Sequence, residues 1–374
     1  MITAPDAPET LAAREPARPG PARGVGGVRA NRRGLRAAIV GSVLTVGLLA
    51  TLVASATIGQ FDTTLGEVVD SLVRVLTGAA SPSESRLDAA LWAIRFPRAL
   101  LAMIVGACLA VAGAVMQGVF ANPLAEPSIV GVSSGASVGA AVVIVFGLTA
   151  VTPAALPIAA FLGALVVTLA VWALARTGGK AAVLTLVLTG IAINAIATAA
   201  TSFLIFLGDT SSREQVIFWQ LGTLSDARWS SVAITGGVFA VAFAGCLLVR
   251  GNLDVLALGD TSAATSGVPV ERLRVIAILL VCLLTGVAVA FSGVIAFVGL
   301  IVPHALRLLV GPSHRYLVPL SALGGAVLLS LADIVARTII PFGDLPIGIF
   351  TAVVGGPLFL VLLRRTLRGQ GVRA

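Results

Sequence analysis

The stretch from residue 127 to residue 175, PSIVGVSSGASVGAAVVIVFGLTAVTPAALPIAAFLGALVVTLAVWALA, contains no ionisable side chain. About 20 apolar residues are enough to cross the ~30 Å hydrocarbon core of a bilayer as one helix. We therefore predict two membrane-spanning helices here, at residues 130–148 and 156–175. Gly131, Gly135 and Gly139 recur at every fourth position of the first helix, a spacing that lets helices approach closely in lipid.

The rest of the chain has a similar composition. Of 374 residues, 57% are apolar and only 11% are charged, and the mean hydropathy is +1.04. Soluble globular domains carry about 25% charged residues, so this class is excluded. We predict an all-α polytopic membrane protein whose ten spans lie at residues 37–57, 98–118, 130–148, 156–175, 182–207, 231–249, 275–293, 296–310, 317–339 and 346–363.

The placement of basic residues predicts the orientation. All but one of the 25 basic residues are arginine, the exception being Lys180. If the N-terminus is cytoplasmic, ten spans place 18 basic residues on the cytoplasmic side and 7 on the other, as the positive-inside rule requires. We therefore expect a multi-pass protein of the plasma (cytoplasmic) membrane with both termini cytoplasmic. The net charge of +8 then gives no reason to expect a nucleic-acid partner.

The flanks and connections have their own patterns. Residues 1–35 are rich in Pro, Ala, Arg and Gly, and we expect a disordered cytoplasmic tail. Residues 36–365 form the transmembrane domain, and residues 366–374 form a second cytoplasmic tail. Apolar residues recur at helical spacing within 61–78, which predicts a short amphipathic helix. The three cysteines lie inside apolar segments, where we expect them buried and reduced.

Catalytic constellations are sparse. There are two histidines, and the sequence has no HExxH motif. Lys180 follows two glycines but precedes Ala181, so the phosphate-binding loop is missing. An integral membrane enzyme therefore lacks a nucleophile–base set, and ATP, if it drives transport, must be bound by another chain.

An ion-coupled secondary transporter would need ionisable groups inside the membrane. Asp333 is the only acidic residue within a span, and Arg337 lies four positions on, on the same helix face. A locally neutralised pair explains both residues better than a proton relay. Gln117 and Asn194 are uncharged, and either interhelical hydrogen bonding or a place on a pathway would account for them.

Three segments stand out between the spans. Arg95 and Arg98 open the second span on the outer side against the positive-inside bias, which either docking or interfacial snorkelling would explain. Residues 122–127, NPLAEP, make a tight polar break. In residues 253–274, Asp260 or Thr261 can cap a short helix that Gly267 and Pro269 can end. Its small side chains suit insertion into a partner's groove, although a simple connector is the alternative.

Together these motifs resemble the FecCD family, the permease subunits of ABC importers for iron–siderophores, haem and cobalamin. The resemblance covers about residues 37–365. It rests on the ordered matches RFPR at 95–98, GAVMQ at 113–117, NPLAEP at 122–127, GVSSGA at 131–136, LALGD at 256–260, FVGLIVPH at 297–304, LADIVAR at 331–337 and LPIG at 345–348. The long N-terminal segment departs from the family pattern.

The resemblance implies a ten-helix subunit that pairs with a second permease subunit, identical or related. It implies two cytoplasmic ABC ATPase subunits, which bind ATP and Mg²⁺, and an extracytoplasmic substrate-binding protein, whereas this chain carries no cofactor. The arginines that would meet the binding protein are Arg95, Arg98 and Arg337. Coupling to the ATPase is implied for Leu256, Leu258, Gly259, Asp260, Ala263 and Gly267. The pathway or gate would include Gln117, Asn122, Pro123, Leu124 and Asn194.

The implied function is ATP-driven import of an iron chelate, a ferric siderophore, without chemical change to it. Haem and cobalamin are the alternatives within the family, and an ion-coupled secondary transporter is the alternative of another class.

Overall fold

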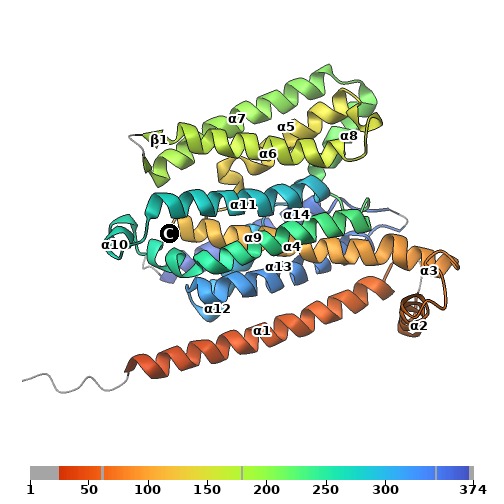
Figure 1. Cartoon of the computed structure of the whole chain (residues 1–374), viewed down its shortest axis with the longest axis horizontal. Helices are drawn as coiled ribbons and strands as arrows, with labels where there is room; N and C mark the ends of the chain where they lie inside the picture. The colour runs from red at the N-terminus through yellow and green to blue at the C-terminus, as the bar shows by residue number, and fades with distance from the viewer. Residues whose placement is uncertain (1–24, 60–62, 178–179, 342, 370–374) are drawn as a thin grey trace, which may run out of the picture.

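The computed structural model describes residues 25–59, 63–177, 180–341 and 343–369. Its long helices run roughly along one axis (Figure 1). The short helix α10 (Asp260–Thr265) lies at one end, and α2 (Leu65–Leu76) and α3 (Arg86–Ala90) lie at the other. We refer to these as the α10 end and the α3 end.

A helix is present at each of the ten ranges expected from hydropathy. Seven helices in the described part of the chain are long and apolar enough to cross a membrane, and three apolar helices are shorter. The long helices are α1 (Val25–Thr57), α4 (Phe96–Val119, continuous with α3), α6 (Ala155–Leu174), α7 (Val183–Leu207), α9 (Trp229–Leu256), α11 (Val270–Ser292) and α13 (His314–Ala336). The shorter apolar ones are α5 (Val132–Val145), α12 (Val298–Val310) and the first part of α14 (Ile347–Gly369).

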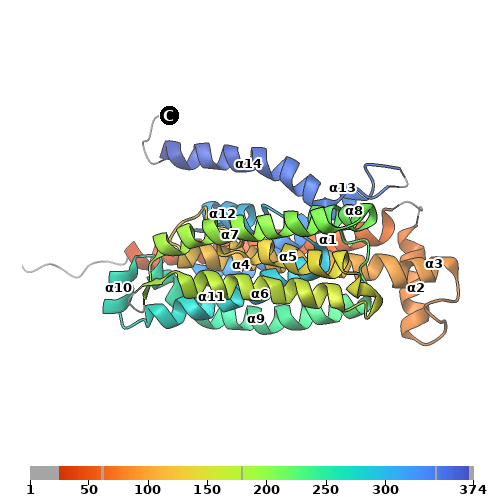
Figure 2. The ribbon, with the colours of Figure 1, turned by 90° about the horizontal axis from the view of Figure 1, so that it is seen from above.

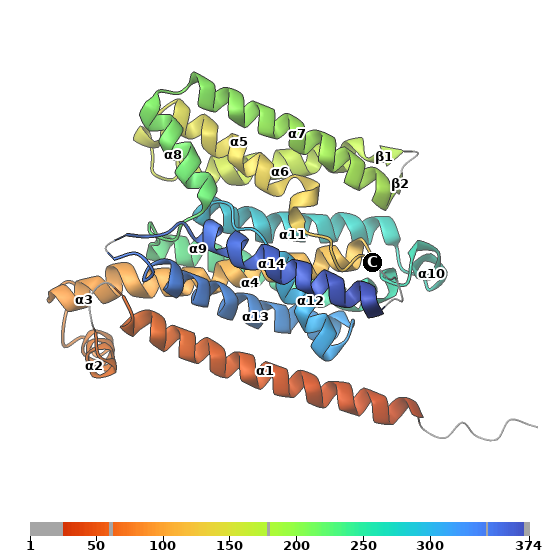
Figure 3. The same cartoon turned by 180° about the vertical axis from the view of Figure 1, so that it is seen from behind.

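The connections add several small elements. These are the π-helical turn η1 (Leu91–Arg95), the 3-10 turns η2 (Pro127–Val130) and η3 (Leu148–Ala150), helix α8 (Thr210–Leu221), and the strands β1 (Arg176–Thr177) and β2 (Lys180–Ala181). The two strands pair antiparallel. Helix α14 ends at the same end of the bundle as α10, where α1 also begins (Figure 1, Figure 3).

Helix α4 occupies the centre of the bundle. It packs against α13, α11, α9 and α12, and almost all of its side chains are buried. Two glycines permit this close packing, because a Cβ at Gly106 would overlap the carbonyl of Gly325 and a Cβ at Gly113 would overlap that of Gly299. Small residues at helix crossings replace the hydrophobic driving force that is absent between helices in lipid.

The outer helices form two groups around this centre. Helix α1 packs along α13, while α5, α6 and α7 form a group beyond α11 (Figure 1). The expected glycine stripe produces a close contact between α5 and α6, because a Cβ at Gly135 or Gly139 would overlap the backbone of Gly163 or Ala159. Helix α14 stands apart from most of the bundle (Figure 2).

Helices α1 and α8 differ from the sequence expectation. Helix α1 begins at Val25, well before residue 37, so only residues 1–24 of the expected tail lie outside the described residues. The segment 25–36 is polar but has no proline to stop the helix from continuing towards the N-terminus. Helix α8 was not predicted, because it is polar. Asp209 caps it, and the backbone N–H of Ser212 lowers the pKa of the Asp209 carboxyl below its ordinary value.

Other local expectations are confirmed. The amphipathic helix expected within residues 61–78 is α2, which begins with a capping box between Thr64 and Glu67. Cys108, Cys246 and Cys282 are free thiols and all are buried.

Candidate functional site

The sequence-selected polar residues fall into groups at the two ends of the bundle. At the α3 end, the guanidinium of Arg98 bridges two carboxylates. Its Nε donates to Asp333 Oδ1 at 2.9 Å and its Nη1 donates to Asp344 Oδ2 at 2.8 Å. Asp333 lies near the end of α13, whereas Asp344 lies in the connection from α13 to α14. Arg98 therefore joins α4 to both.

Arg337 completes this cluster from the end of α13. Its Nε lies 3.6 Å from Asp333 Oδ2, and its Nη2 donates to the carbonyl and hydroxyl oxygens of Ser55 in α1 at 2.8 and 3.0 Å. The neutralised Asp333–Arg337 pair expected from the sequence is present. The structure adds Arg98 as the nearer partner of Asp333, at a separation of 235 positions that local spacing does not reveal.

Arg95 lies beside this cluster but has different partners. Its Nη1 donates to the carbonyl oxygens of Ala56 and Thr57 at 2.6 and 3.2 Å and to Thr63 Oγ1 at 2.9 Å. The carbonyls near the C-terminus of a helix have no intrahelical donor. Arg95 therefore caps the end of α1.

The expectation that these three arginines face outward is not met in the subunit. Arg95, Arg98 and Arg337 are only 6%, 8% and 6% exposed. The physical reason is that the ends of α1, α4 and α13 converge here and supply enough oxygen atoms to hold the guanidinium groups inside. In this conformation these side chains are therefore too buried to contact a docking partner directly.

Asp344 is the member of the cluster that reaches the surface, with its side chain 39% exposed. Burial would raise the pKa of its carboxyl, but hydrogen bonds from Arg98 and from Ser225 Oγ, at 2.7 Å, together with nearby guanidinium charge lower the pKa below its ordinary value. Asp344 is therefore an anionic surface group whose position is fixed by the buried Arg98.

The π-helical turn η1 positions both Arg95 and a nearby carbonyl. The N–H of Phe96 bonds the carbonyl of Leu91, one residue further back than in an α-helix. The next donor would be Pro97, which has no N–H. The carbonyl of Trp92 is thus left without a helical partner, and it accepts the indole N–H of Trp229 at 2.7 Å instead. Pro97 thereby fixes where α9 begins relative to α4.

At the α10 end, the expected short helix is present as α10. The helix does not begin as expected, because Gly259 rather than Asp260 or Thr261 is the N-cap and no side chain caps it. Asp260 has another partner, since Arg274 Nη2 in α11 donates to its Oδ1 at 2.6 Å. The Arg274 side chain is 2% exposed and also lies 3.7 Å from Glu271.

The residues assigned to coupling divide between core and surface. Leu256 and Ala263 are buried, at 1% and 0% exposure, and they attach α10 to the bundle. Leu258 is 75% exposed. Gly259 has φ +107°, a conformation that side chains disfavour. Gly267 has φ +82° and follows the C-cap residue Ser266. Leu258 is therefore the apolar side chain that this segment offers to a partner.

Among the residues assigned to the pathway, the side chains of Gln117 and Asn194 have different partners. Gln117 is 2% exposed, donates to the carbonyl of Leu300 at 3.3 Å and accepts from Arg307 at 3.4 Å. Asn194 instead joins α7 to α5 and η2, accepting from Ser134 and donating to the carbonyl of Ser128 at 3.1 Å. Both make interhelical hydrogen bonds, which was one of the two explanations that the sequence allowed for them.

The break at residues 122–127 is a turn. Asn122 Oδ1 accepts the N–H of Leu124 at 2.9 Å across Pro123, an Asx turn. Asn122 is exposed, whereas Pro123 and Leu124 are half-buried.

A second polar junction was not predicted from the sequence. Asp254 in α9 accepts from Ser313 Oγ, the backbone N–H of His314 and His314 Nδ1, at 2.8, 2.6 and 2.7 Å. This junction ties the helix that leads into α10 to the start of α13. Its residues are 59 and 60 positions apart, and no motif connects them. Within the described ranges, no group of three or more His, Cys, Asp or Glu residues could hold a metal ion.

The fold defines a class of protein, the polytopic helical membrane protein, and comparison with known proteins narrows it to the permease subunit of an ABC importer. Residues 47–365 match the model of the FecCD transport family, and the chain belongs to that family. It is 42% identical over 282 residues to the hemin transport system permease protein HmuU of Yersinia pestis, which covers 73% of this chain and 82% of that protein. It is 45% identical over 273 residues to the cobalamin import system permease protein BtuC of Halobacterium salinarum, covering 72% of each.

A solved structure agrees with this assignment. A metal-chelate type ABC transporter in an inward-facing conformation matches with a TM-score of 0.77 and 32% sequence identity, over 87% of this chain and 99% of that chain. The match covers the helical bundle, so the all-α architecture expected from the sequence is confirmed.

Proposed function

We propose that this chain is one half of a dimeric permease that imports a bulky metal chelate, with a ferric siderophore as our first candidate cargo. The observation that carries the proposal is the family membership of residues 47–365. The apolar interior supports it, since Asp333, the acidic residue expected within a span, is already paired with Arg98 and Arg337. That pairing removes the site on which an ion-coupled secondary transporter would depend.

The face for the second permease subunit is the one that carries α14. Helix α14 stands apart from the bundle (Figure 2), and it exposes Val353, Val354 and Leu360 at 66%, 47% and 57%. A helix with little packing inside its own subunit is stabilised by packing against another. We assign the transport path to the axis between two copies, or between this chain and a related one.

The two ends of the bundle would then face different partners. By the positive-inside bias, the α10 end and both termini are cytoplasmic. Leu258 and α10 would contact an ABC ATPase that binds ATP and Mg²⁺. At the α3 end a substrate-binding protein would meet Asp344 and the surface above Arg95, Arg98 and Arg337. These arginines would act indirectly, by fixing the positions of the helix ends and of Asp344.

Haem and cobalamin form the second candidate cargo class, because the names of two relatives specify hemin and cobalamin transport. All three cargoes are large, flat or folded chelates, and a weakly binding apolar path suits each of them. Specificity would rest largely with the binding protein.

The test is transport by the assembled system. The chain would be reconstituted in liposomes with the ATPase and the binding protein encoded with it, and uptake of ⁵⁵Fe-labelled hydroxamate and catecholate siderophores, haem and cobalamin would be compared. We expect ATP-dependent accumulation of a siderophore. Accumulation of haem or cobalamin alone would show that the cargo is that compound and not a siderophore. Uptake driven by a proton gradient without the ATPase would overturn the importer assignment.

A further inference from the structure

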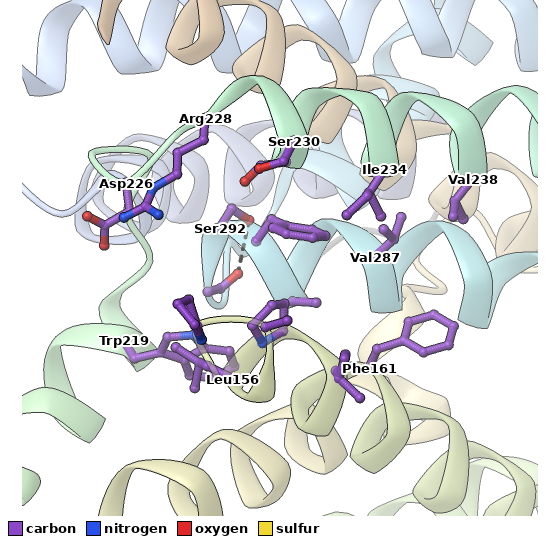
Figure 4. Close-up of a pocket in the computed structure, with 18 of the residues that line it drawn as sticks. Leu156, Phe161, Trp219, Asp226, Arg228, Ser230, Ile234, Val238, Val287 and Ser292 are labelled. Atoms are coloured by element: carbon purple, nitrogen blue, oxygen red, sulfur yellow. Dashed lines mark hydrogen bonds between the residues drawn. The ribbon is translucent and has the colours of Figure 1, made fainter. Parts of the chain in front are cut away.

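A pocket of about 780 Å³ opens at the α3 end, between α6, α9 and α11 (Figure 4). Its deeper wall is apolar and includes Phe161, Val238 and Val287. The rim is also apolar, and Ile158, Leu162 and Ile234 are 55%, 51% and 51% exposed. In a membrane-spanning bundle these half-exposed side chains face hydrocarbon, so the pocket opens sideways towards lipid.

The pocket lies away from the proposed dimer face. Helices α6 and α9 are on one side of the bundle, and α14 is on the opposite side (Figure 2). The second permease subunit and the transport path between subunits therefore do not account for the pocket.

The mouth of the pocket is at the level of a membrane interface. Trp219 lines the mouth, and Trp229 and Trp92 lie beside it, in contact with each other. Tryptophan concentrates where hydrocarbon meets the headgroup layer. The apolar wall below this level is consequently at the depth of acyl chains, and the polar residues around it are at the depth of headgroups.

The mouth carries one charge of each sign. Asp226 and Arg228 both line the pocket and are exposed, and Figure 4 shows them side by side. Across the described residues, neither side chain has a hydrogen bond or an ion pair within the subunit. Arg98 and Asp333 at the same end pair with each other, whereas Asp226 and Arg228 are available to a ligand.

A serine hydroxyl points to the same ligand position. Ser231 lines the pocket and is 8% exposed, and within the described parts of the chain its hydroxyl has no hydrogen-bond partner. Ser231 is in the first turn of α9, whose N-cap residue, Arg228, makes no capping hydrogen bond. The hydroxyl, the free backbone N–H groups and the guanidinium together favour a phosphate oxygen.

We propose that this pocket binds a zwitterionic phospholipid with an amine headgroup, phosphatidylethanolamine in chemical class. The phosphate contacts Arg228, Ser231 and the first turn of α9, the ammonium contacts Asp226, and one acyl chain lies between α6, α9 and α11. The lipid stabilises the junction of α9 with α11 from the side opposite the transport path. This assignment does not depend on the cargo.

The test measures lipid retention by native mass spectrometry of the purified chain in detergent, titrated with palmitoyl-oleoyl phosphatidylethanolamine or the phosphatidylglycerol of the same chains. We expect the ethanolamine lipid to bind about tenfold more tightly, because one charge-assisted hydrogen bond to Asp226 distinguishes the two. Asp226→Asn should remove that preference. Arg228→Gln should weaken both lipids about tenfold, whereas Arg86→Gln, an exposed arginine at the same end, should change neither.

A second pair of variants tests the acyl-chain position. Ile234→Trp fills the rim and should abolish retention, while Val241→Trp, on the same helix, 72% exposed and outside the pocket, should leave retention unchanged. Equal binding of phosphatidylglycerol by the wild-type chain would overturn the headgroup assignment. Retention by Ile234→Trp would overturn the pocket, and effective competition by soluble glycerophosphoethanolamine would show that the ligand is not a lipid.

Discussion

Arg98 at the α3 end and Arg274 at the α10 end are both buried, and each bonds a carboxylate that reaches the surface. Arg98 is 8% exposed and bonds Asp344, in the connection before α14, whereas Arg274 is 2% exposed and bonds Asp260, at the start of α10. In each case the buried partner comes from a long helix and the exposed partner from a short connecting segment. A planar guanidinium with several donors suits this task, because it fixes an orientation as well as a charge.

The two ends differ in what else the arginine holds. Arg98 also pairs with Asp333, which is 1% exposed, and the cluster extends through Arg337 to Ser55 in α1. Arg274 also lies 3.7 Å from the half-exposed Glu271, its neighbour on α11. The α3 end therefore uses its arginine to join α1, α4 and α13. The α10 end uses its arginine to position one small helix.

The sharpest way to break this comparison is to remove Arg98. Arg98→Leu leaves Asp333 buried with only the longer contact to Arg337, and unpairing a buried charge destabilises a protein by roughly 3–5 kcal/mol. We expect a large fall in the thermal unfolding temperature of the purified chain. Arg86→Leu, at an exposed position of the same end, is the matched control and should have little effect. An unchanged unfolding temperature for Arg98→Leu would mean that the cluster does not hold the bundle together.

The next effect concerns the α10 end and leaves the bundle intact. Leu258→Ser removes the exposed apolar side chain from the segment before α10, and burying a leucine at an interface contributes roughly 1.5–3 kcal/mol. We expect the affinity for the ATPase subunit to fall about tenfold or more in a pull-down titration. Leu148→Ser, 40% exposed in η3 at the α3 end, should not change it. Wild-type affinity in the Leu258 variant would remove α10 from the coupling assignment.

Arg274 tests whether α10 must be held in place to couple. Arg274→Met keeps the buried stem but releases Asp260, so α10 becomes more mobile and ATPase affinity should fall about fivefold, less than for Leu258→Ser. The neighbouring Arg272 is exposed, and Arg272→Met supplies the control. If both variants bind the ATPase equally well, the ion pair with Asp260 has no positioning role.

The spans could be predicted because each is encoded locally. An apolar run such as residues 156–175 specifies its own helix, which the structure shows as Ala155–Leu174. The glycines of α5 likewise predicted a close helix contact. Helix α8 could not be found this way, since it is polar and is defined by its Asp209 cap. The early start of α1 was missed because hydropathy detects the apolar part of a helix that spans the membrane, and not a polar extension of the same helix.

The polar clusters were only half predictable. Arg98 and Arg337 stood out because they oppose the positive-inside bias, and the structure places both in one polar cluster. The sequence reasoning placed them on the surface, because charge counting does not show which buried oxygens are nearby. Asp344 and Ser225 gave no signal, since the bonds from Arg98 and Ser225 to Asp344 depend on how the connection before α14 folds back.

The smallest expected effect comes from Asp344, and it separates holding the bundle from presenting a surface. Asp344→Asn keeps the shape but removes a charge that is 39% exposed, and partly exposed ion pairs contribute only about 0–1 kcal/mol. Because Asp333 still pairs with Arg98, the unfolding temperature should fall far less than in Arg98→Leu. If a binding protein docks above this cluster, its association rate should change, and the change should shrink at high salt. Asp70→Asn, an exposed carboxylate of α2 paired with Arg74, is the control. An unfolding temperature as low as that of Arg98→Leu would show that the surface carboxylate, and not Asp333, is the partner that matters.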